Sequence, residues 1–160
     1  MGDSVDGLDV PVPAGYRLRH LEETDFAKGL VPLLAQLTSV GELTEERFLE
    51  VCRLRARQAD TYKTLVIEHA ESGVLAGTAT LMVEAKFVHG GASVGHVEDV
   101  VVDSAHRGRG LAKVLTAGLH RLASAAGCYK VILDCKEENC GLYEKCGYRR
   151  NEVQMRLDLE

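Results

Sequence analysis

A basic, glycine-rich turn is the first feature of the sequence that can do chemistry. Its residues are Arg107, Gly108, Arg109, Gly110, Leu111 and Ala112. It joins a strand-like run at 97–102 to a helix-like run at 111–126, so its amide N–H groups lie at a helix N-terminus, which favours an anion. Because glycines permit a tight turn and leave these amides uncovered, the pattern predicts a diphosphate-binding turn. A surface turn that caps a helix is the alternative.

Two adjacent carboxylates interrupt the apolar run that leads into this turn. Glu98 and Asp99 lie within the stretch from Gly95 to Val102. Neighbouring side chains of a strand point to opposite faces, and burying an unpaired carboxylate is costly. We therefore expect one carboxylate to face a buried side, or the strand to be bulged here. An edge strand with both side chains in solvent is the alternative.

A second polar group follows an apolar run near the end of the chain. Asp134 closes the run at 129–135, and Asn139 and Tyr143 come next, in a short helix that Gly147 stops. We expect Asp134 and Tyr143 to lie beside the helix that opens at Gly110. A tyrosine on an amphipathic helix is more often a core residue, which is the alternative interpretation of Tyr143.

The elements that must position these groups form a single α/β (α+β) domain, with a mixed central sheet flanked by about four helices. Strands are expected at 16–21, 63–68, 74–83, 93–102 and 129–135, with one or two more from residue 148 onward. Helices are expected at 24–37, from 44 onward, at 111–126 and at 139–146. Residues 1–15 are expected to form a flexible arm, and residues 16–160 the folded domain.

Composition excludes several classes of function. The net charge of −5 argues against nucleic acid as the main partner. No apolar run approaches the roughly 20 residues needed to cross a membrane, and no secretory signal is visible, so we expect an intracellular, cytoplasmic protein. The number of cysteines, five, is odd, and no two of them have C-x-x-C spacing. We therefore expect neither a zinc site nor a disulfide framework, and we expect no other bound metal.

The turn, written R-x-x-G-x-A, resembles the pyrophosphate loop of the GNAT acyltransferases, whose donor is acetyl-coenzyme A. The blocks at 95–102, 128–135 and 143–147 more specifically resemble the glucosamine-6-phosphate N-acetyltransferases, and segments 37–41 and 86–89 match that family's sugar site. The resemblance covers residues 16–156. It implies an N-acetyltransferase domain that acetylates the amine of D-glucosamine 6-phosphate, a step of UDP-N-acetylglucosamine biosynthesis, and an intertwined homodimer with acceptor residues from both chains.

The resemblance also implies the site residues. Donor binding falls to Val100, Val101, Val102, Arg107, Gly108, Arg109, Gly110, Leu111, Ala112, Asn139 and Tyr143. Acceptor binding falls to Thr38, Lys86, Phe87, Val88, His89, Glu98, Asp99 and Asp134. The family's basic phosphate ligand is replaced here by Asp158, so Arg156, on the same strand face, is the expected substitute, with Arg149 and Arg150 as weaker candidates.

Catalysis is expected from Asp134, Tyr143 and Glu98. An amine attacks a thioester only as the free base, so Asp134 orients the amine and accepts its proton directly or through water. A strand N–H near Val100 stabilises the oxyanion, and the Tyr143 hydroxyl protonates the leaving thiolate. Two alternatives remain open: a GNAT enzyme for a polyamine or a protein N-terminus, and a non-catalytic acetyl-coenzyme A-binding module.

Overall fold

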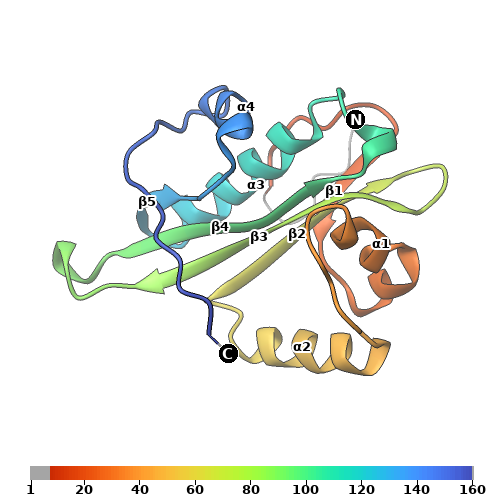
Figure 1. The fold of residues 1–160 in the computed structure, drawn as a ribbon, viewed down its shortest axis with the longest axis horizontal. Coiled ribbons are helices and arrows are strands. Elements are labelled where there is room, and N and C mark those ends of the chain that lie inside the picture. The colour runs from red at the N-terminus through yellow and green to blue at the C-terminus, as the bar shows by residue number, and fades with distance from the viewer. Residues whose placement is uncertain (1–7, 160) are drawn as a thin grey trace.

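The computed structural model describes residues 8–159 and is built on a five-stranded sheet in the order β1-β2-β3-β4-β5 (Figure 1). The strands are β1 Tyr16–His20, β2 Tyr62–His69, β3 Leu75–Ala85, β4 Ser93–Val102 and β5 Cys128–Ile132. Neighbours are antiparallel except β4 and β5, which run parallel. The expected mixed sheet is therefore confirmed.

Helices cover both faces of this sheet. The α-helices are α1 Leu30–Ala35, α2 Glu45–Arg57, α3 Leu111–Ala125 and α4 Cys140–Glu144. Short 3₁₀ helices are η1 Glu23–Lys28, η2 His89–Gly91, η3 Ser104–His106 and η4 Glu137–Asn139. One buried cluster lies between α3 and the sheet, and a second lies where α1 and α2 pack on the opposite face (Figure 1).

The two longest helices follow the patterns that predicted them. The Thr44 hydroxyl caps α2 by accepting a hydrogen bond from the Arg47 N–H at 3.2 Å, which satisfies an otherwise free amide. Leu111, Leu115 and Leu119 form one fully buried stripe of α3. The spacing of that stripe matches the helical period, so it holds α3 against the sheet.

Two expected elements differ in the structure. The helix expected at 24–37 is split at Gly29, whose φ of 87° is left-handed and cannot continue a helix, into η1 and α1. No strand occurs from residue 148 to 159, since this segment joins neither edge of the sheet. Its alternate apolar side chains are exposed instead, from Val153 to Leu159.

The segment before β1 is packed rather than loose. Leu8 is 6% exposed, and Val10 and Val12 contact the same cluster as α3. The flexible arm expected at 1–15 is therefore wrong for residues 8–12, because their apolar side chains bury against the core. Residues 1–7 lie outside the described part of the chain. Within residues 8–159, no helix has the length and apolar character to span a membrane.

Candidate active site

The glycine-rich turn presents an uncovered helix end. Gly108 and Gly110 have φ of 74° and 78°, and a Cβ added at either would meet nothing within 4 Å. Gly110 is the residue before α3 and supplies no side-chain cap, so the first amides of this 15-residue helix have no partner from a capping side chain. The Arg107 Nε donates to the Val102 carbonyl at 3.3 Å, which ties the turn to the end of β4. Free amides, a helix dipole and two arginines suit a diphosphate.

Strand β4 is bulged at the two predicted carboxylates. Thr78 pairs with Val101 and Thr80 with Glu98, so Asp99 and Val100 together oppose a single residue of β3. Asp99 takes a φ of 53° to make this bulge. A bulge leaves the extra residue outside the hydrogen-bonded ladder, so a backbone N–H here is available to a ligand. The local bulge expected from the adjacent carboxylates is confirmed.

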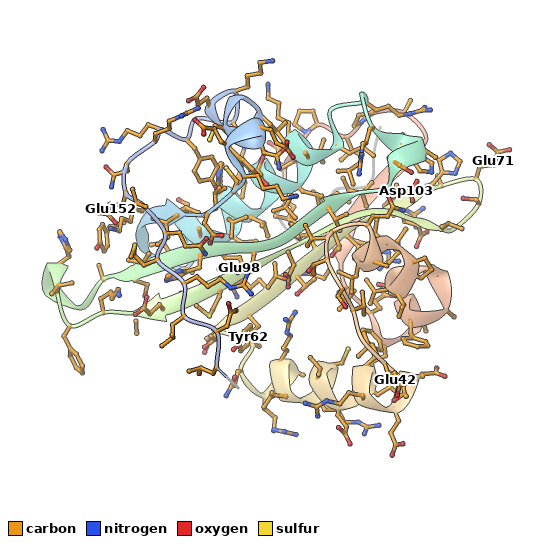
Figure 2. The ribbon with its side chains drawn as sticks, viewed as in Figure 1. Glu42, Tyr62, Glu71, Glu98, Asp103 and Glu152 are labelled. Atoms are coloured by element: carbon orange, nitrogen blue, oxygen red, sulfur yellow. The ribbon has the colours of Figure 1, made fainter. Side chains whose placement is uncertain are left out.

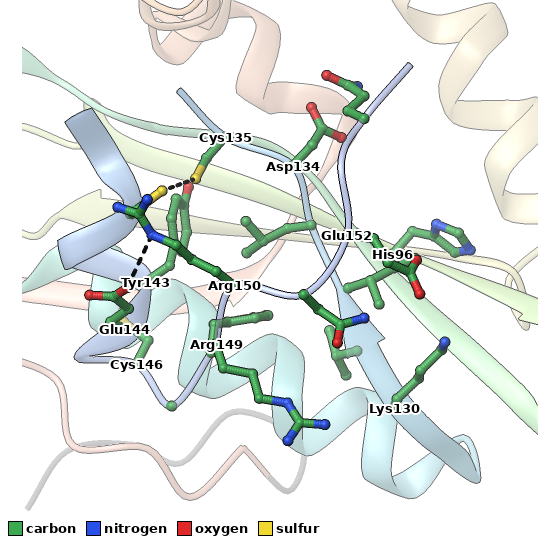
Figure 3. Close-up of a pocket in the computed structure, with 18 of the residues that line it drawn as sticks. His96, Lys130, Asp134, Cys135, Tyr143, Glu144, Cys146, Arg149, Arg150 and Glu152 are labelled. Atoms are coloured by element: carbon green, nitrogen blue, oxygen red, sulfur yellow. Dashed lines mark hydrogen bonds and ion pairs between the residues drawn. The ribbon is translucent and has the colours of Figure 1, made fainter. Parts of the chain in front are cut away.

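The pairing of strands β4 and β5 ends close to this bulge. Their parallel pairing ends at His96 and Ile132, while β4 continues to Val102. A cavity of about 970 Å³ occupies the region between the end of β5, α4 and residues 149–154 (Figure 3). Glu98, Asp134 and Tyr143 all line it. The structure thus brings together the three residues expected to do catalysis.

The carboxylates at this cavity lack a cationic partner. Within residues 8–159, Glu98 and Asp134, which line the cavity, take part in none of the ion pairs, and neither does Asp99, which does not line it. Loss of hydration raises the pKa of Glu98, and the charges of Asp134 and Asp99 raise it further. Figure 2 shows Glu98 near the middle of the molecule, over the sheet. A group that brings positive charge is therefore favoured here.

Tyr143 is held in its neutral form. Burial raises its pKa first, followed by the neighbouring groups of Cys135, Cys146 and Asp134, so the hydroxyl keeps its proton near neutral pH. Its ring meets the edge of Tyr148, with centroids 5.9 Å apart. The Tyr148 hydroxyl in turn hydrogen-bonds the His120 Nε2 at 2.7 Å. Sequence reasoning missed this support from Tyr148, which lies five residues after Tyr143.

Cations lie on another side of the same cavity. Lys130 and Arg149 line it, and Figure 3 shows both on the side away from Asp134. Arg150 also lines it but is held by Glu137 and Glu144. The predicted phosphate ligand Arg156 does not line the cavity; its Nε donates to Asp158 at 2.7 Å.

The predicted sugar-site segments lie apart from the glycine turn. The segment 86–89 forms the projecting end of the β3–β4 hairpin (Figure 1). Phe87 is fully exposed there, and the His89 ring packs on Tyr129 at 4.2 Å between centroids. Lys86 is paired with Glu84 at 2.7 Å, and His96 hydrogen-bonds the same carboxylate. Thr38 is exposed just after α1. Within one chain, neither Thr38 nor residues 86–89 line the cavity.

The remaining predicted donor residues lie along two elements. Val100, Val101 and Val102 close β4, and Asn139 precedes α4. Val101 is 5% exposed and packs in the cluster below α1, so only its backbone can serve a ligand. In the described part of the chain, no group of three or more His, Cys, Asp or Glu side chains is arranged to hold a metal ion.

The sequence matches a known family along most of its length. The model of the "Acetyltransferase (GNAT) family" matches residues 19–148. The chain is 44% identical over 142 residues to the glucosamine 6-phosphate N-acetyltransferase of Trypanosoma brucei brucei, covering 89% of this chain and 95% of that protein. It is 42% identical over 140 residues to the Arabidopsis thaliana protein of the same name, covering 88% and 94%.

Solved structures agree with the sequence matches. The crystal structure of glucosamine-6-phosphate N-acetyltransferase from Arabidopsis thaliana superposes with a TM-score of 0.88 at 41% identity, covering 91% of this chain and 99% of that one. A Trypanosoma brucei acetyltransferase superposes with a TM-score of 0.83 at 43% identity, covering 90% and 99%. The similarity therefore extends over nearly the whole fold.

Proposed function

Because the chain belongs to the GNAT acetyltransferase family and, within it, to the glucosamine 6-phosphate N-acetyltransferases, we propose that it acetylates the amine of D-glucosamine 6-phosphate. The donor is acetyl-coenzyme A, and the products are N-acetyl-D-glucosamine 6-phosphate and coenzyme A. The observation that carries the proposal is the similarity to relatives of that name over nearly the whole chain. A place in UDP-N-acetylglucosamine biosynthesis and an intracellular location belong to the same proposal; cell fractionation checks the location.

Acetyl-coenzyme A supplies an activated acetyl thioester, and its pyrophosphate fits the turn at 107–112. The uncapped amides at the start of α3 and the open space at Gly108 and Gly110 support this assignment. Arg107 and Arg109 add positive charge. Backbone groups at Val100–Val102 and the side chain of Asn139 are assigned to the rest of the donor.

The unpaired carboxylates are assigned to the acceptor amine. An ammonium group is attracted to Glu98, Asp99 and Asp134, which have no cation of their own among the described residues. One of these carboxylates then takes the proton that the amine must lose before attack. The backbone N–H at the bulge near Val100 donates to the carbonyl oxygen as negative charge develops on it.

Tyr143 is assigned to the leaving thiolate. Its raised pKa keeps a proton available on the hydroxyl, and the packing of Tyr148 holds the ring in the cavity wall. The thiolate can accept that proton as it departs. The amine attacks the thioester directly, so no covalent acyl-enzyme is part of the proposal.

The sugar phosphate is assigned to Arg149 and Lys130. Both line the cavity that holds Glu98 and Asp134, so one ligand with a phosphate and an amine can reach both sets of groups. Arg156, the residue indicated by the sequence, is neutralised by Asp158 within its own chain. Arg156 could bind the sugar phosphate only if the C-terminal segment of a second copy of the chain reached this cavity.

We also infer a homodimer with shared active sites. The segment at 86–89 is far from the glycine turn of its own chain, so its role at a sugar site needs a second copy (Figure 1). Val153, Met155, Leu157 and Leu159 are 83–90% exposed on one face of an extended segment. Such alternation suits a strand that pairs with another chain. Light scattering should give a dimer mass, and Leu157→Glu should shift it toward the monomer.

An acceptor panel tests the proposed reaction. The protein is mixed with acetyl-coenzyme A and glucosamine 6-phosphate, glucosamine, spermidine or a peptide with a free N-terminus, and product is identified by mass spectrometry. We expect N-acetylglucosamine 6-phosphate to form at least about 10-fold faster than any other product, since charge-assisted phosphate bonds are strong. Faster acetylation of the polyamine or the peptide would replace the acceptor. Donor binding without any product would favour a non-catalytic module.

A further inference from the structure

Two cysteines meet at the wall of the cavity. The Sγ atoms of Cys135 and Cys140 are 3.8 Å apart (Figure 3). Cys135 is exposed, and both residues line the cavity. We propose that this pair is a reversible oxidation site, at which a disulfide bond between Cys135 and Cys140 slows the enzyme. The bond itself is independent of the proposed function, whereas its effect on turnover rests on it.

The local structure allows the two sulfurs to join. A disulfide bond is about 2.05 Å long, so the sulfurs must approach each other by roughly 2 Å. The chain between them is short and contains η4, Glu137–Asn139. Every residue from 134 to 139 is exposed, so this segment can shift without disturbing a packed core. Neither sulfur is held by a metal or by an existing disulfide.

Exchange with a small-molecule disulfide supplies the oxidant. The thiolate of one cysteine attacks a disulfide such as that of glutathione or coenzyme A, forming a mixed disulfide and releasing one thiol. The second cysteine attacks the protein sulfur of that mixed disulfide and releases the other thiol. Two cysteine thiols are oxidised, one external disulfide is reduced, and both protons leave on the released thiols. A reducing dithiol reverses the reaction.

The hydrogen bond between the sulfurs and local loss of hydration also affect reactivity. Both raise the pKa of the Cys135 thiol, and loss of hydration is the larger cause. Cys135 is therefore mostly protonated near neutral pH, which protects it from direct oxidation by weak oxidants. A nearby partner thiol makes the second step intramolecular. The pair can therefore proceed from the mixed disulfide to an internal disulfide bond, whereas an isolated cysteine would stop at the mixed disulfide.

The bond would disturb catalysis from both sides. Asp134 immediately precedes Cys135, and Tyr143 lies one helical turn after Cys140. Drawing the two sulfurs together therefore moves the backbone that carries the proposed proton acceptor and the proposed proton donor. A misplacement of about 1 Å can cost about 10²-fold in rate, so we expect at least a 10-fold loss.

The experiment oxidises the intact protein in glutathione buffers of increasing disulfide content. Peptide mapping identifies the linked cysteines, and mass spectrometry measures formation of N-acetylglucosamine 6-phosphate, since thiol reagents would also detect glutathione. We expect a Cys135–Cys140 link to form as the rate falls at least about 10-fold, and dithiothreitol to restore both. A link that leaves the rate unchanged overturns the effect on turnover. Glutathione attached to single cysteines, with no link, overturns the site.

Matched variants assign the response. Cys135→Ser and Cys140→Ser should each lose the redox response relative to their own rates under reducing conditions. Cys128→Ser, which changes a half-buried cysteine outside the cavity, should keep it. A response that survives Cys140→Ser overturns the proposal. If the reduced protein forms no product, the proposed function fails, while the peptide map still decides whether the bond forms.

Discussion

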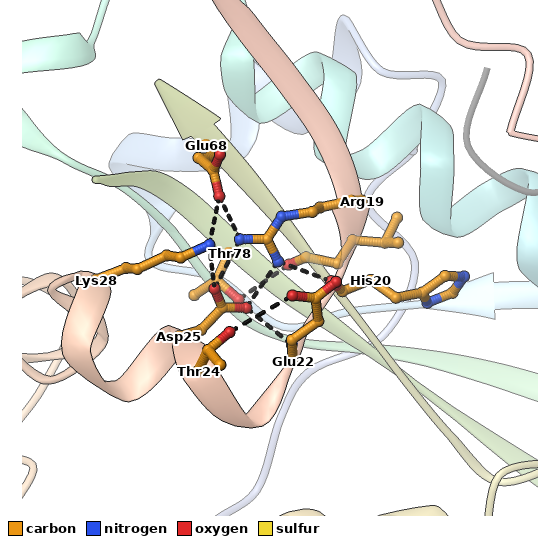
Figure 4. A network of polar contacts seen from close by, with 9 residues as sticks. Arg19, His20, Glu22, Thr24, Asp25, Lys28, Glu68 and Thr78 are labelled. Carbon is orange, nitrogen blue, oxygen red and sulfur yellow. Dashed lines mark hydrogen bonds and ion pairs between the residues drawn. The ribbon is translucent and has the colours of Figure 1, made fainter. Parts of the chain in front are cut away.

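Asp25 and Glu68 lie among cations, whereas Glu98 and Asp134 of the same domain line one cavity and make no ion pair within residues 8–159. Around Asp25, the guanidinium of Arg19 makes two hydrogen bonds at 2.6 and 2.8 Å, and Lys28 bridges to Glu68 at 2.9 Å (Figure 4). Asp25 is completely buried and Arg19 nearly so. Two negative and two positive groups therefore balance within this network.

The active-site carboxylates have the opposite arrangement. Loss of hydration and then like charges raise the pKa of Glu98, whereas hydrogen bonds from Arg19 and then Lys28 lower the pKa of Glu68. The network joins β1, η1 and β2, and it holds the fold. Among the described residues, the cavity carboxylates form no ion pair that links one secondary-structure element to another, so they remain available to bind a ligand. The comparison separates charges that stabilise the protein from charges that recognise a substrate.

Breaking the buried network should give the largest loss of stability. Asp25→Asn keeps the shape and an acceptor for the Glu22 N–H, but it removes the charge opposite buried Arg19. We expect the free energy of unfolding to fall by about 3 kcal/mol, because the buried guanidinium of Arg19 loses one of its two carboxylate partners and keeps only Glu68. Urea denaturation measures the change. Glu50→Gln, which breaks the exposed Arg47–Glu50 pair, is the control and should cost less than about 0.5 kcal/mol.

The same substitution in the cavity should affect rate instead. Asp134→Asn removes a charge that pairs with no cation among the described residues, so we expect unfolding to change by less than about 0.5 kcal/mol. It also removes a proton acceptor, so kcat with glucosamine 6-phosphate should fall by about 10²-fold. Steady-state kinetics and urea denaturation on one preparation separate these effects. A variant that loses stability but keeps its kcat would make Asp134 structural.

The cationic side chains on the other side of the cavity should affect the binding of the acceptor rather than stability or turnover. Arg149→Ala should raise KM for glucosamine 6-phosphate by about 10-fold, since it removes a charged hydrogen bond to phosphate. KM for unphosphorylated glucosamine should stay the same. Arg156→Ala is the matched variant, and its own pairing with Asp158 predicts little change. The reverse result would assign the phosphate to Arg156, as the sequence indicated, by way of a second copy.

The smallest effect is an opposite pH dependence of stability at two glutamates. The lowered pKa of Glu68 contributes stability above its unfolded pKa, and this is lost as pH falls through the folded value. The raised pKa of Glu98 contributes stability below its unfolded pKa, and this is lost as pH rises through the folded value. Urea midpoints of Glu68→Gln and Glu98→Gln should thus diverge from the parent in opposite directions. Parallel pH profiles would contradict this assignment.

Local signals predicted much of the structure. The cap at Thr44 and the leucine stripe of α3 each act within a few residues, so the sequence contains all the information for them. The bulge at Asp99 was also predictable, because two adjacent carboxylates in an apolar strand conflict with simple alternation. The cavity carboxylates followed from the family motif together with this conflict.

Signals that depend on distant partners were not predictable in the same way. Arg19 meets Glu68 only through the register of β1 on β2, in which Arg19 opposes Val66 and Glu68 lies two residues further along. One or two strands were expected from residue 148 onward, but a strand needs a neighbour, and residues 148–159 pair with neither edge strand of the sheet, β1 or β5. Gly29 outweighed the helical spacing around it because its backbone is left-handed.

Because β4 and β5 form the single parallel pair in the sheet, we expect β5 to join the sheet later than the antiparallel strands do. Strand β5 can reach β4 only after α3 has crossed over, whereas β2, β3 and β4 are joined by short connections. β5 is also five residues long and half exposed, so its amides should exchange with deuterium faster than those of β3. We expect the wall that carries Asp134 and Tyr143 to open more readily than the antiparallel strands β2, β3 and β4. Ligands can enter by this local opening while the antiparallel strands stay protected.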